Sequence, residues 1–221
     1  MMRRPAMLNE PRESGVSRIV LGIVFAIVLI VLVFDLLRAF VFLVVEVKGD
    51  SMRDTLYGGE HVGSGYTGGD ILYAVRGNDV SRGDIVILDT TASEAYDADG
   101  SAVFSAEIII KRIIAVEGDC VRCENGVLWR KEAGGEYVPL DEPYAKGRTP
   151  DFAEVCLGAG EIFFLGDNRA NSADSEDIVK EGYPLLTTDD VVGVVPDWAV
   201  FIKGFSTALE RFRAGIYGIF A

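Results

Sequence analysis

Hydrophobic residues follow two different patterns along this chain: one long uninterrupted run near the start and many short runs afterwards. Residues 19–34 contain no charged side chain, and Leu36 and Leu37 lengthen the run. A membrane-spanning helix needs about 20 consecutive apolar residues, so residues 17–37 predict an uncleaved membrane anchor. A cleaved signal peptide, the alternative, has a shorter apolar stretch before small residues, whereas the sequence DLLRAFVFLVV follows here.

The remaining short runs predict β-strands separated by turns. In the stretch VVEVKG, two valines alternate with Glu46 and Lys48, which is typical of a half-buried strand. The stretches RGDIVIL, EIIIKRIIAVEGD, EIFFLGD and DVVGVV are rich in β-branched residues, and Asn-Gly within VRCENGVLWR predicts a hairpin turn. This pattern favours a mainly β fold, with an antiparallel β domain over residues 39–221 and an accessory β segment at 118–160.

The segment after Phe205 also predicts a helix. It carries Glu210, Arg211 and Arg213, and these charges argue against a second membrane span. The segment either lies on a membrane surface or forms an ordinary C-terminal helix, and the pattern leaves both readings open.

The distribution of charge predicts which side of a membrane each part occupies. The chain of 221 residues has a net charge of −13, of which the segment before the apolar run contributes +2. The charged residues of that segment are Arg3, Arg4, Arg12, Arg18, Glu10 and Glu13. Asp35 and Arg38 lie one helical turn apart and cancel, so the rest of the chain carries −15.

Arginine and lysine in short flanks of a membrane span stay in the cytoplasm. We therefore expect a short cytoplasmic segment at 1–18, a transmembrane anchor at 19–38 and an acidic domain outside. The strong negative charge of this domain argues against nucleic acid as a partner. Its expected effect is to keep the domain soluble.

The three cysteines fit an extracytoplasmic domain loosely. Cys120 and Cys123 are three residues apart, so on one strand their side chains point to opposite faces and a bridge between them is disfavoured. The alternatives are buried thiols or a single bridge from one of them to Cys156. A zinc site is disfavoured because it needs four ligands and the sole histidine, His61, lies far away in the sequence.

Hydrolysis needs a nucleophile and a group that takes its proton. A triad of serine, histidine and aspartate could use only His61, and its surroundings GGEHVGSG show no catalytic motif. A lysine can replace histidine when burial favours its neutral amine. Lys111 fits because isoleucines surround it in IIIKRII, and on a strand its side chain points away from that of Arg112. A lysine on a solvated edge strand is the alternative.

Four stretches follow the apolar run in the order VKGDSMRDTL, RGDIVIL, IIIKRIIAVEGD and LGDNRANSADS. In this order they resemble the boxes of bacterial type I signal peptidases, the leader peptidase family with a catalytic serine and lysine. LDEPY at 140–144 and DVVGVV at 190–195 resemble the segments that link these boxes. The resemblance covers the chain from the anchor to about Val195. It implies a signal-peptidase-like antiparallel β catalytic domain behind one transmembrane helix.

The resemblance also implies a role for each matching residue. Ser51 would be the nucleophile, Lys111 the general base, and Ser172 the hydroxyl that orients the lysine. Asp167 would pair with Arg112, and the Ser51 backbone N–H would stabilise the oxyanion. The residues that match the family's pockets for small substrate side chains are Val45, Val47, Met52, Leu56, Ile109 and Ile110.

Three residues depart from the family pattern. Asp54 replaces a proline, which leaves the turn after the nucleophile less rigid. Gly49 stands where many members have a hydroxyl residue, so a second oxyanion donor would be a backbone N–H or absent. Glu176 replaces an arginine that pairs with the supporting aspartate, here Asp174, which therefore loses this partner. With both acids in an exposed loop, Glu176→Arg should leave activity intact and raise stability by about 1 kcal/mol or less.

The expected protein is a membrane-bound serine endopeptidase that removes signal peptides from exported preproteins after small residues at −1 and −3. It would use no cofactor and no metal, and act as a monomer. The expected location is the cytoplasmic membrane of a bacterium, with a single span, the N-terminus inside and the catalytic domain outside. A self-cleaving repressor with the same dyad would need a DNA-binding head in place of the anchor. A non-catalytic membrane-anchored β-domain is the alternative from another class.

Overall fold

The computed structural model describes residues 15–91 and 108–219 of the chain, and the charged residues before position 15 lie outside this part. The chain divides into two compact units, Met1–Val41 and Phe42–Ala221, which are described separately. The first unit contains α1 (Gly15–Phe40). Within the described residues, Ser17–Phe40 is the one helix long and apolar enough to cross a membrane.

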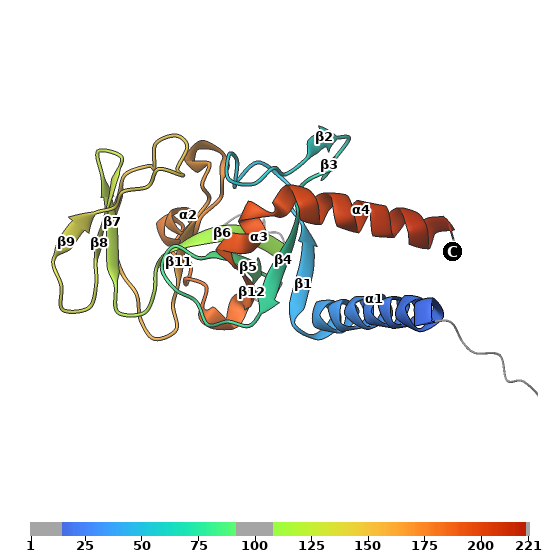
Figure 1. Cartoon of the computed structure of the whole chain (residues 1–221). Coiled ribbons are helices and arrows are strands. Elements are labelled where there is room, and N and C mark those ends of the chain that lie inside the picture. The colour runs from blue at the N-terminus through green and yellow to red at the C-terminus, as the bar shows by residue number, and fades with distance from the viewer. Residues whose placement is uncertain (1–14, 92–107, 220–221) are drawn as a thin grey trace, which may run out of the picture. The chain divides into compact units, whose positions relative to one another are not determined.

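The second unit is built on a six-stranded sheet, and the prediction of a mainly antiparallel β fold is confirmed. The order across the sheet is β1, β4, β12, β5, β6, β11, and neighbouring strands run antiparallel (Figure 1). These strands are β1 (Phe42–Glu46), β4 (Ile71–Arg76), β5 (Ile85–Asp89), β6 (Ile108–Ala115), β11 (Phe163–Leu165) and β12 (Val191–Val195).

Strand β5 shows how this sheet is held in the core. Ile85 and Ile87 belong to one apolar cluster, with Met52, while Val86 and Leu88 belong to another. Successive side chains of a strand point to opposite faces, so both faces of the sheet are buried here. Short helices supply part of this cover: α3 (Asp197–Phe201) contributes Ala199 to the first cluster, and α2 (Ser175–Lys180) contributes Ile178 to the second.

A second sheet of four antiparallel strands occupies residues 120–156, in the order β10, β7, β8, β9. The strands are β7 (Cys120–Glu124), β8 (Val127–Lys131), β9 (Tyr137–Pro139) and β10 (Phe152–Cys156). The predicted Asn-Gly turn joins β7 to β8, with positive φ at both Asn125 and Gly126, as a tight hairpin of type I′ requires. A disulfide between Cys120 and Cys156 links β7 to β10, while Cys123 is a buried free thiol.

A hairpin, two 3-10 turns and a C-terminal helix also belong to this unit. A small hairpin is formed by β2 (Glu60–Val62) and β3 (Gly65–Thr67). Single 3-10 turns span Arg169–Asn171 and Thr188–Asp190. The predicted C-terminal helix is α4 (Lys203–Ile219), which packs on β4.

Candidate active site

Ser51 lies in the turn that follows β1, and a second loop holds this turn from behind. The backbone N–H of Asn168 donates to the Ser51 carbonyl at 2.9 Å, and the Asn168 side-chain amide donates to the Asp50 carbonyl at 2.9 Å. Both contacts use backbone oxygens, so the Ser51 hydroxyl is left to face the adjoining cavity. The GDNR stretch therefore fixes the position of the candidate nucleophile.

Lys111 lies in β6, opposite Val86 of β5, and its side chain is 5% exposed. This burial excludes the alternative of a solvated edge-strand lysine. Its Nζ donates three hydrogen bonds: to the Ser172 hydroxyl, to the Ala173 carbonyl at 2.7 Å and to an Asp174 carboxylate oxygen at 2.7 Å. Three donated bonds use every N–H of an ammonium group, so this geometry is that of the protonated lysine.

Asp174 is the most connected group of the site. Besides the Lys111 ammonium, it accepts hydrogen bonds from the Ser172 hydroxyl and from the Gly166 backbone N–H at 2.9 Å. It is also the N-cap residue of α2, in a capping box with Asp177. Asp174 thus compensates the buried positive charge directly, although the arginine of the family pattern is absent. Sequence reasoning left its role open because strand alternation does not show that this loop reaches β6.

Gly166 is required where the three loops converge. A Cβ atom at this position would lie 2.2 Å from the Ser172 hydroxyl oxygen and 2.6 Å from the Ser51 carbonyl oxygen. Any larger residue would therefore separate the nucleophile turn from the loop that carries Ser172.

The structure brings Arg112 and Asp167 together on the other side of β6. The guanidinium binds the fully buried carboxylate through two contacts, Nε to Oδ1 at 2.8 Å and Nη2 to Oδ2 at 2.7 Å. The Thr55 hydroxyl donates to the same carboxylate at 2.5 Å, which adds a link to the nucleophile turn. The Arg112 guanidinium also lies 3.9 Å from the centre of the Tyr144 ring. This bidentate pairing holds Asp167 beside the turn that presents Ser51.

The LDEPY segment joins the same framework through Glu142. Arg169 donates to the two Glu142 carboxylate oxygens at 3.1 and 2.6 Å, and to the Thr149 hydroxyl at 2.5 Å. The resemblance marked this segment only as a linking segment, and its contact with the GDNR stretch is a long-range pairing that no local pattern indicates.

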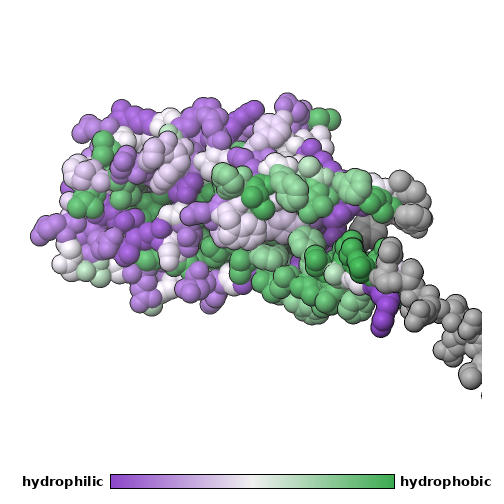
Figure 2. All heavy atoms as spheres, viewed as in Figure 1, coloured by the Kyte–Doolittle hydropathy of each residue, from purple (hydrophilic) through white to green (hydrophobic). Residues whose placement is uncertain are grey.

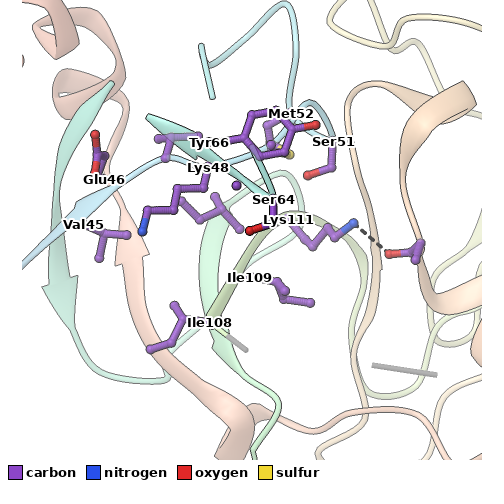
Figure 3. Close-up of a pocket in the computed structure, with 15 residues that line it drawn as sticks. Val45, Glu46, Lys48, Ser51, Met52, Ser64, Tyr66, Ile108, Ile109 and Lys111 are labelled. Atoms are coloured by element: carbon purple, nitrogen blue, oxygen red, sulfur yellow. Dashed lines mark hydrogen bonds between the residues drawn. The ribbon is translucent and has the colours of Figure 1, made fainter. Parts of the chain in front are cut away.

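Ser51 and Lys111 line one cavity of about 750 Å³. Figure 3 shows the Lys111 side chain reaching from β6 towards the side of the cavity on which Ser51 lies. Of the six predicted pocket residues, five line this cavity, namely Val45, Val47, Met52, Ile109 and Ile110. Leu56 is the exception: it is 1% exposed and belongs to the core cluster with Met52 instead of the cavity wall.

Three residues of the small hairpin and its turn, Ser64, Gly65 and Tyr66, also line the cavity, and sequence reasoning missed them. Ser64 and Tyr66 lie on the wall of the cavity together with Lys48, which follows β1 (Figure 3). The glycine-rich sequence around the hairpin carries no signal for this placement, because it depends on how the hairpin folds back over the nucleophile turn.

Two departures from the family pattern have simple structural outcomes. The N–H of Gly49 donates to the Gly58 carbonyl at 3.2 Å, so this amide already has an acceptor within the fold. The Asp54 side chain is exposed and lies 3.2 Å from the Lys146 ammonium, away from the Lys111 group.

The third departure, Glu176, corrects an expectation. It lies in α2, not in an exposed loop, and is 2% exposed, so the small energy of a surface pair does not apply to it. Its Oε2 has no hydrogen-bond partner within the described part of the chain. Burial, together with the charge of the neighbouring Asp174, raises the pKa of Glu176 to about 7. The fold therefore favours the neutral acid at this position.

Glu176 should make the stability of the domain depend on pH. Its pKa rises from 4.5 to about 7 on folding, so the folded state binds more protons than the unfolded state between these values. The free energy of unfolding should then fall as pH rises through this window, by about 3 kcal/mol in total. Glu176→Gln stays neutral and should lack this fall, as measured by urea unfolding at pH 5 and pH 8.

The exposed Glu181 at the end of the same helix provides the control. Glu181→Gln should keep the wild-type difference between the two pH values. An equal difference in wild type and Glu176→Gln would show that Glu176 ionises normally in the folded protein.

The fold and the site together define a class, that of serine peptidases with a β-rich catalytic domain. Residues 20–198 match the family model described as signal peptidase, peptidase S26, and the chain belongs to this family. Signal peptidase I S of Bacillus subtilis (strain 168) is 33% identical over 192 residues, covering 84% of this chain and 89% of that protein. Signal peptidase I T of the same strain is 31% identical over 174 residues, covering 76% and 79%.

Among the similar solved structures is a signal peptidase I from Enterococcus faecalis, at 22% identity. The match covers 53% of this chain and 97% of that chain, with a TM-score of 0.38.

Proposed function

We propose that this protein is a membrane-bound endopeptidase that cleaves signal peptides from exported preproteins, with Ser51 as nucleophile and Lys111 as general base. The observation that carries the proposal is the cavity that Ser51 and Lys111 share with five apolar residues of β1, the nucleophile turn and β6. The substrate class comes from the family, and the apolar wall favours small side chains at −1 and −3.

The chemistry requires Lys111 to lose a proton first. The ammonium donates three hydrogen bonds, whereas a neutral amine has two N–H groups and one lone pair. Loss of the proton would therefore free one direction for the Ser51 hydroxyl. Bound substrate would exclude water from the cavity and disfavour the charged form.

Neutral Lys111 would then take the proton of the Ser51 hydroxyl as Oγ attacks the scissile carbonyl carbon. The same proton passes to the departing amine, which leaves an acyl-enzyme on Ser51. Water, activated by the lysine in turn, hydrolyses the ester. Ser172 and Asp174 orient the Lys111 ammonium, and the Ser51 backbone N–H is the proposed donor to the oxyanion.

We also propose the orientation in the membrane. The arginines before α1 favour a cytoplasmic N-terminus, and the acidic catalytic unit then lies outside. The disulfide between Cys120 and Cys156 supports an oxidising compartment for this unit.

The proposal is tested with the detergent-purified chain and a preprotein that carries alanine at −1. We expect cleavage after this alanine, identified by the new N-terminal sequence of the product. An Ala→Leu substitution at −1 of the substrate should slow cleavage at least about 10-fold, because branched residues crowd the cavity. Ser51→Ala is the negative control, because it removes the proposed nucleophile and leaves the rest of the cavity unchanged. Equal rates for both substrates would refute the assignment of the apolar pocket.

A further inference from the structure

The small hairpin of β2 and β3 turns one aromatic side chain inward. The hairpin is a separate two-stranded sheet, near the top of Figure 1. Five of its six strand residues are exposed, and hydrophilic and neutral residues cover most of its outer surface (Figure 2). Tyr66 is the exception, because it is half-buried and lines the cavity that contains Ser51 and Lys111. Its side chain therefore faces the cavity.

Glycines at both ends of the hairpin let it lie against the backbone that precedes Ser51. A Cβ atom at Gly58 would lie 1.6 Å from the Gly49 carbonyl oxygen, and one at Gly69 would lie 1.9 Å from the Val47 carbonyl oxygen. A larger residue at either position would push the hairpin away from this backbone. The Gly49 N–H also donates to the Gly58 carbonyl at 3.2 Å. The hairpin is thus fixed to the segment that leads into the nucleophile turn.

Contacts on two sides hold the Tyr66 ring over this segment. Its cross-strand partner is His61, and the two rings meet edge to face with their centroids 5.1 Å apart. A Cβ atom at Gly49 would lie 3.9 Å from Tyr66 Cε2, which is ordinary van der Waals contact. Cε2 is bonded to the carbon that carries the hydroxyl, so the hydroxyl lies near the space that a side chain at position 49 would enter. Figure 3 shows this end of Tyr66 directed towards the side of the cavity on which Ser51 lies.

Position 49 is poorly suited to carry a hydroxyl group of its own. Gly49 has a φ of +86°, a left-handed conformation that a residue with a side chain adopts only with strain. Its N–H already has the Gly58 carbonyl as acceptor. The Ser51 N–H, by contrast, has no acceptor among the described residues, and the Tyr66 hydroxyl has no hydrogen-bond partner in the same part of the chain. Both groups are therefore free to donate to a ligand beside the nucleophile.

We propose that Tyr66 is a catalytic residue whose hydroxyl donates the second hydrogen bond to the oxyanion, beside the Ser51 N–H. This rests on the proposed function, in which Ser51 Oγ attacks the scissile carbonyl carbon. As the tetrahedral intermediate forms, negative charge develops on the carbonyl oxygen, and donors that are already in place stabilise it. Tyr66 keeps its proton throughout, so no covalent bond of the tyrosine is made or broken. The hairpin thus supplies the hydroxyl that Gly49 lacks.

The first test compares Tyr66→Phe with the wild-type chain in detergent, on a soluble peptide that carries alanine at −1. Phenylalanine keeps the ring and removes only the hydroxyl, so kcat should fall roughly 10²-fold while KM stays within about 3-fold, as expected for the loss of one oxyanion donor. Tyr57→Phe is the matched control. The Tyr57 hydroxyl donates to the Glu60 carboxylate at the start of the same hairpin, and Tyr57 does not line the cavity, so kcat should stay at the wild-type value.

A wild-type kcat in Tyr66→Phe would overturn the proposal, and so would a change in KM alone, which would make the ring a wall for a substrate side chain. An equal loss of kcat in Tyr57→Phe would overturn it as well, because the placement of the hairpin would then explain both effects. If Ser64→Ala and not Tyr66→Phe lowers kcat, the donor is Ser64. Each of these outcomes leaves the proposed function intact, whereas a wild-type chain that does not cleave the peptide would refute that function and this role of Tyr66 with it.

A peptide aldehyde provides a readout that a merely structural role of Tyr66 would not change. Ser51 Oγ adds to the aldehyde carbon, and the former carbonyl oxygen then lies in the place of the oxyanion. The inhibition constant of the aldehyde should rise in Tyr66→Phe by about the factor by which kcat falls, because both depend on the same hydrogen bond. The peptide alcohol of the same sequence has no carbonyl and should inhibit both proteins equally. An equal rise for aldehyde and alcohol, or a rise for neither, would overturn the assignment of Tyr66 to the oxyanion.

Discussion

Lys111→Arg should be as inactive as Ser51→Ala, with preprotein cleavage reduced by roughly 10⁴-fold or more, as for nucleophile and base deletions in serine peptidases. Arginine keeps the positive charge and can still donate to Ser172 and Asp174. It cannot act as a base, because its guanidinium stays protonated at every pH at which the protein is folded. The variant therefore separates the charge of Lys111 from its basicity. Lys111→Ala should be equally inactive, while Lys111→His should retain a trace of activity, because imidazole is a base near neutral pH.

The measurement is single-turnover cleavage of a preprotein, followed by gel and by N-terminal sequencing. Lys131→Arg in β8 is the matched control, because Lys131 lies in the four-stranded sheet and contacts the Tyr137 ring. It should cleave at the wild-type rate. Near-ultraviolet circular dichroism would verify that the larger guanidinium leaves the domain folded. Substantial activity of folded Lys111→Arg would mean that another group activates Ser51.

The strands could be predicted from local pattern because each depends on a short periodic stretch, whereas the proposed pairing of Ser51 with Lys111 came from the order of the motifs that resemble the family. Lys111 and Arg112 point to opposite faces of β6, as alternation requires, and the two ends of their side chains meet different carboxylates. The Asn-Gly turn is determined by two residues alone. Strand alternation disfavoured a disulfide between Cys120 and Cys123. Which of the two bonds to Cys156 depends on the pairing of β7 with β10, which places Cys120 opposite Cys156.

Other features of the site depend on contacts between distant segments. Asp174 and Glu176 were expected in an exposed loop, whereas residues Ser175–Lys180 form α2, and Ile178 anchors that helix in the core and carries Glu176 inside. Tyr66 lines the cavity because the small hairpin folds over the cavity. Leu56 does not line it, because its side chain packs in the core cluster with Met52. In each case the residue type was visible in the sequence, but its surroundings were not.

The largest stability effect is expected for the buried pair of Lys111 and Asp174. The side chains are 5% and 0% exposed and lie 2.7 Å apart. Asp174→Asn leaves an uncompensated buried ammonium, and Lys111→Met leaves an uncompensated buried carboxylate, so each change should lower the free energy of unfolding by about 3–5 kcal/mol. The double variant removes both charges and should lose clearly less than the sum of the single variants.

The cycle is measured by urea unfolding in detergent at fixed pH, with tryptophan emission as the signal. The exposed pair of Arg148 and Asp151, at 3.3 Å and with side chains 65% and 52% exposed, is the control. Its coupling energy should stay below about 1 kcal/mol, because water screens exposed charges. If the losses in free energy of unfolding of the two single variants simply add up in the double variant, Lys111 and Asp174 do not stabilise each other. Strong coupling would instead show that Lys111 takes the place of the missing arginine as the cation that pairs with Asp174.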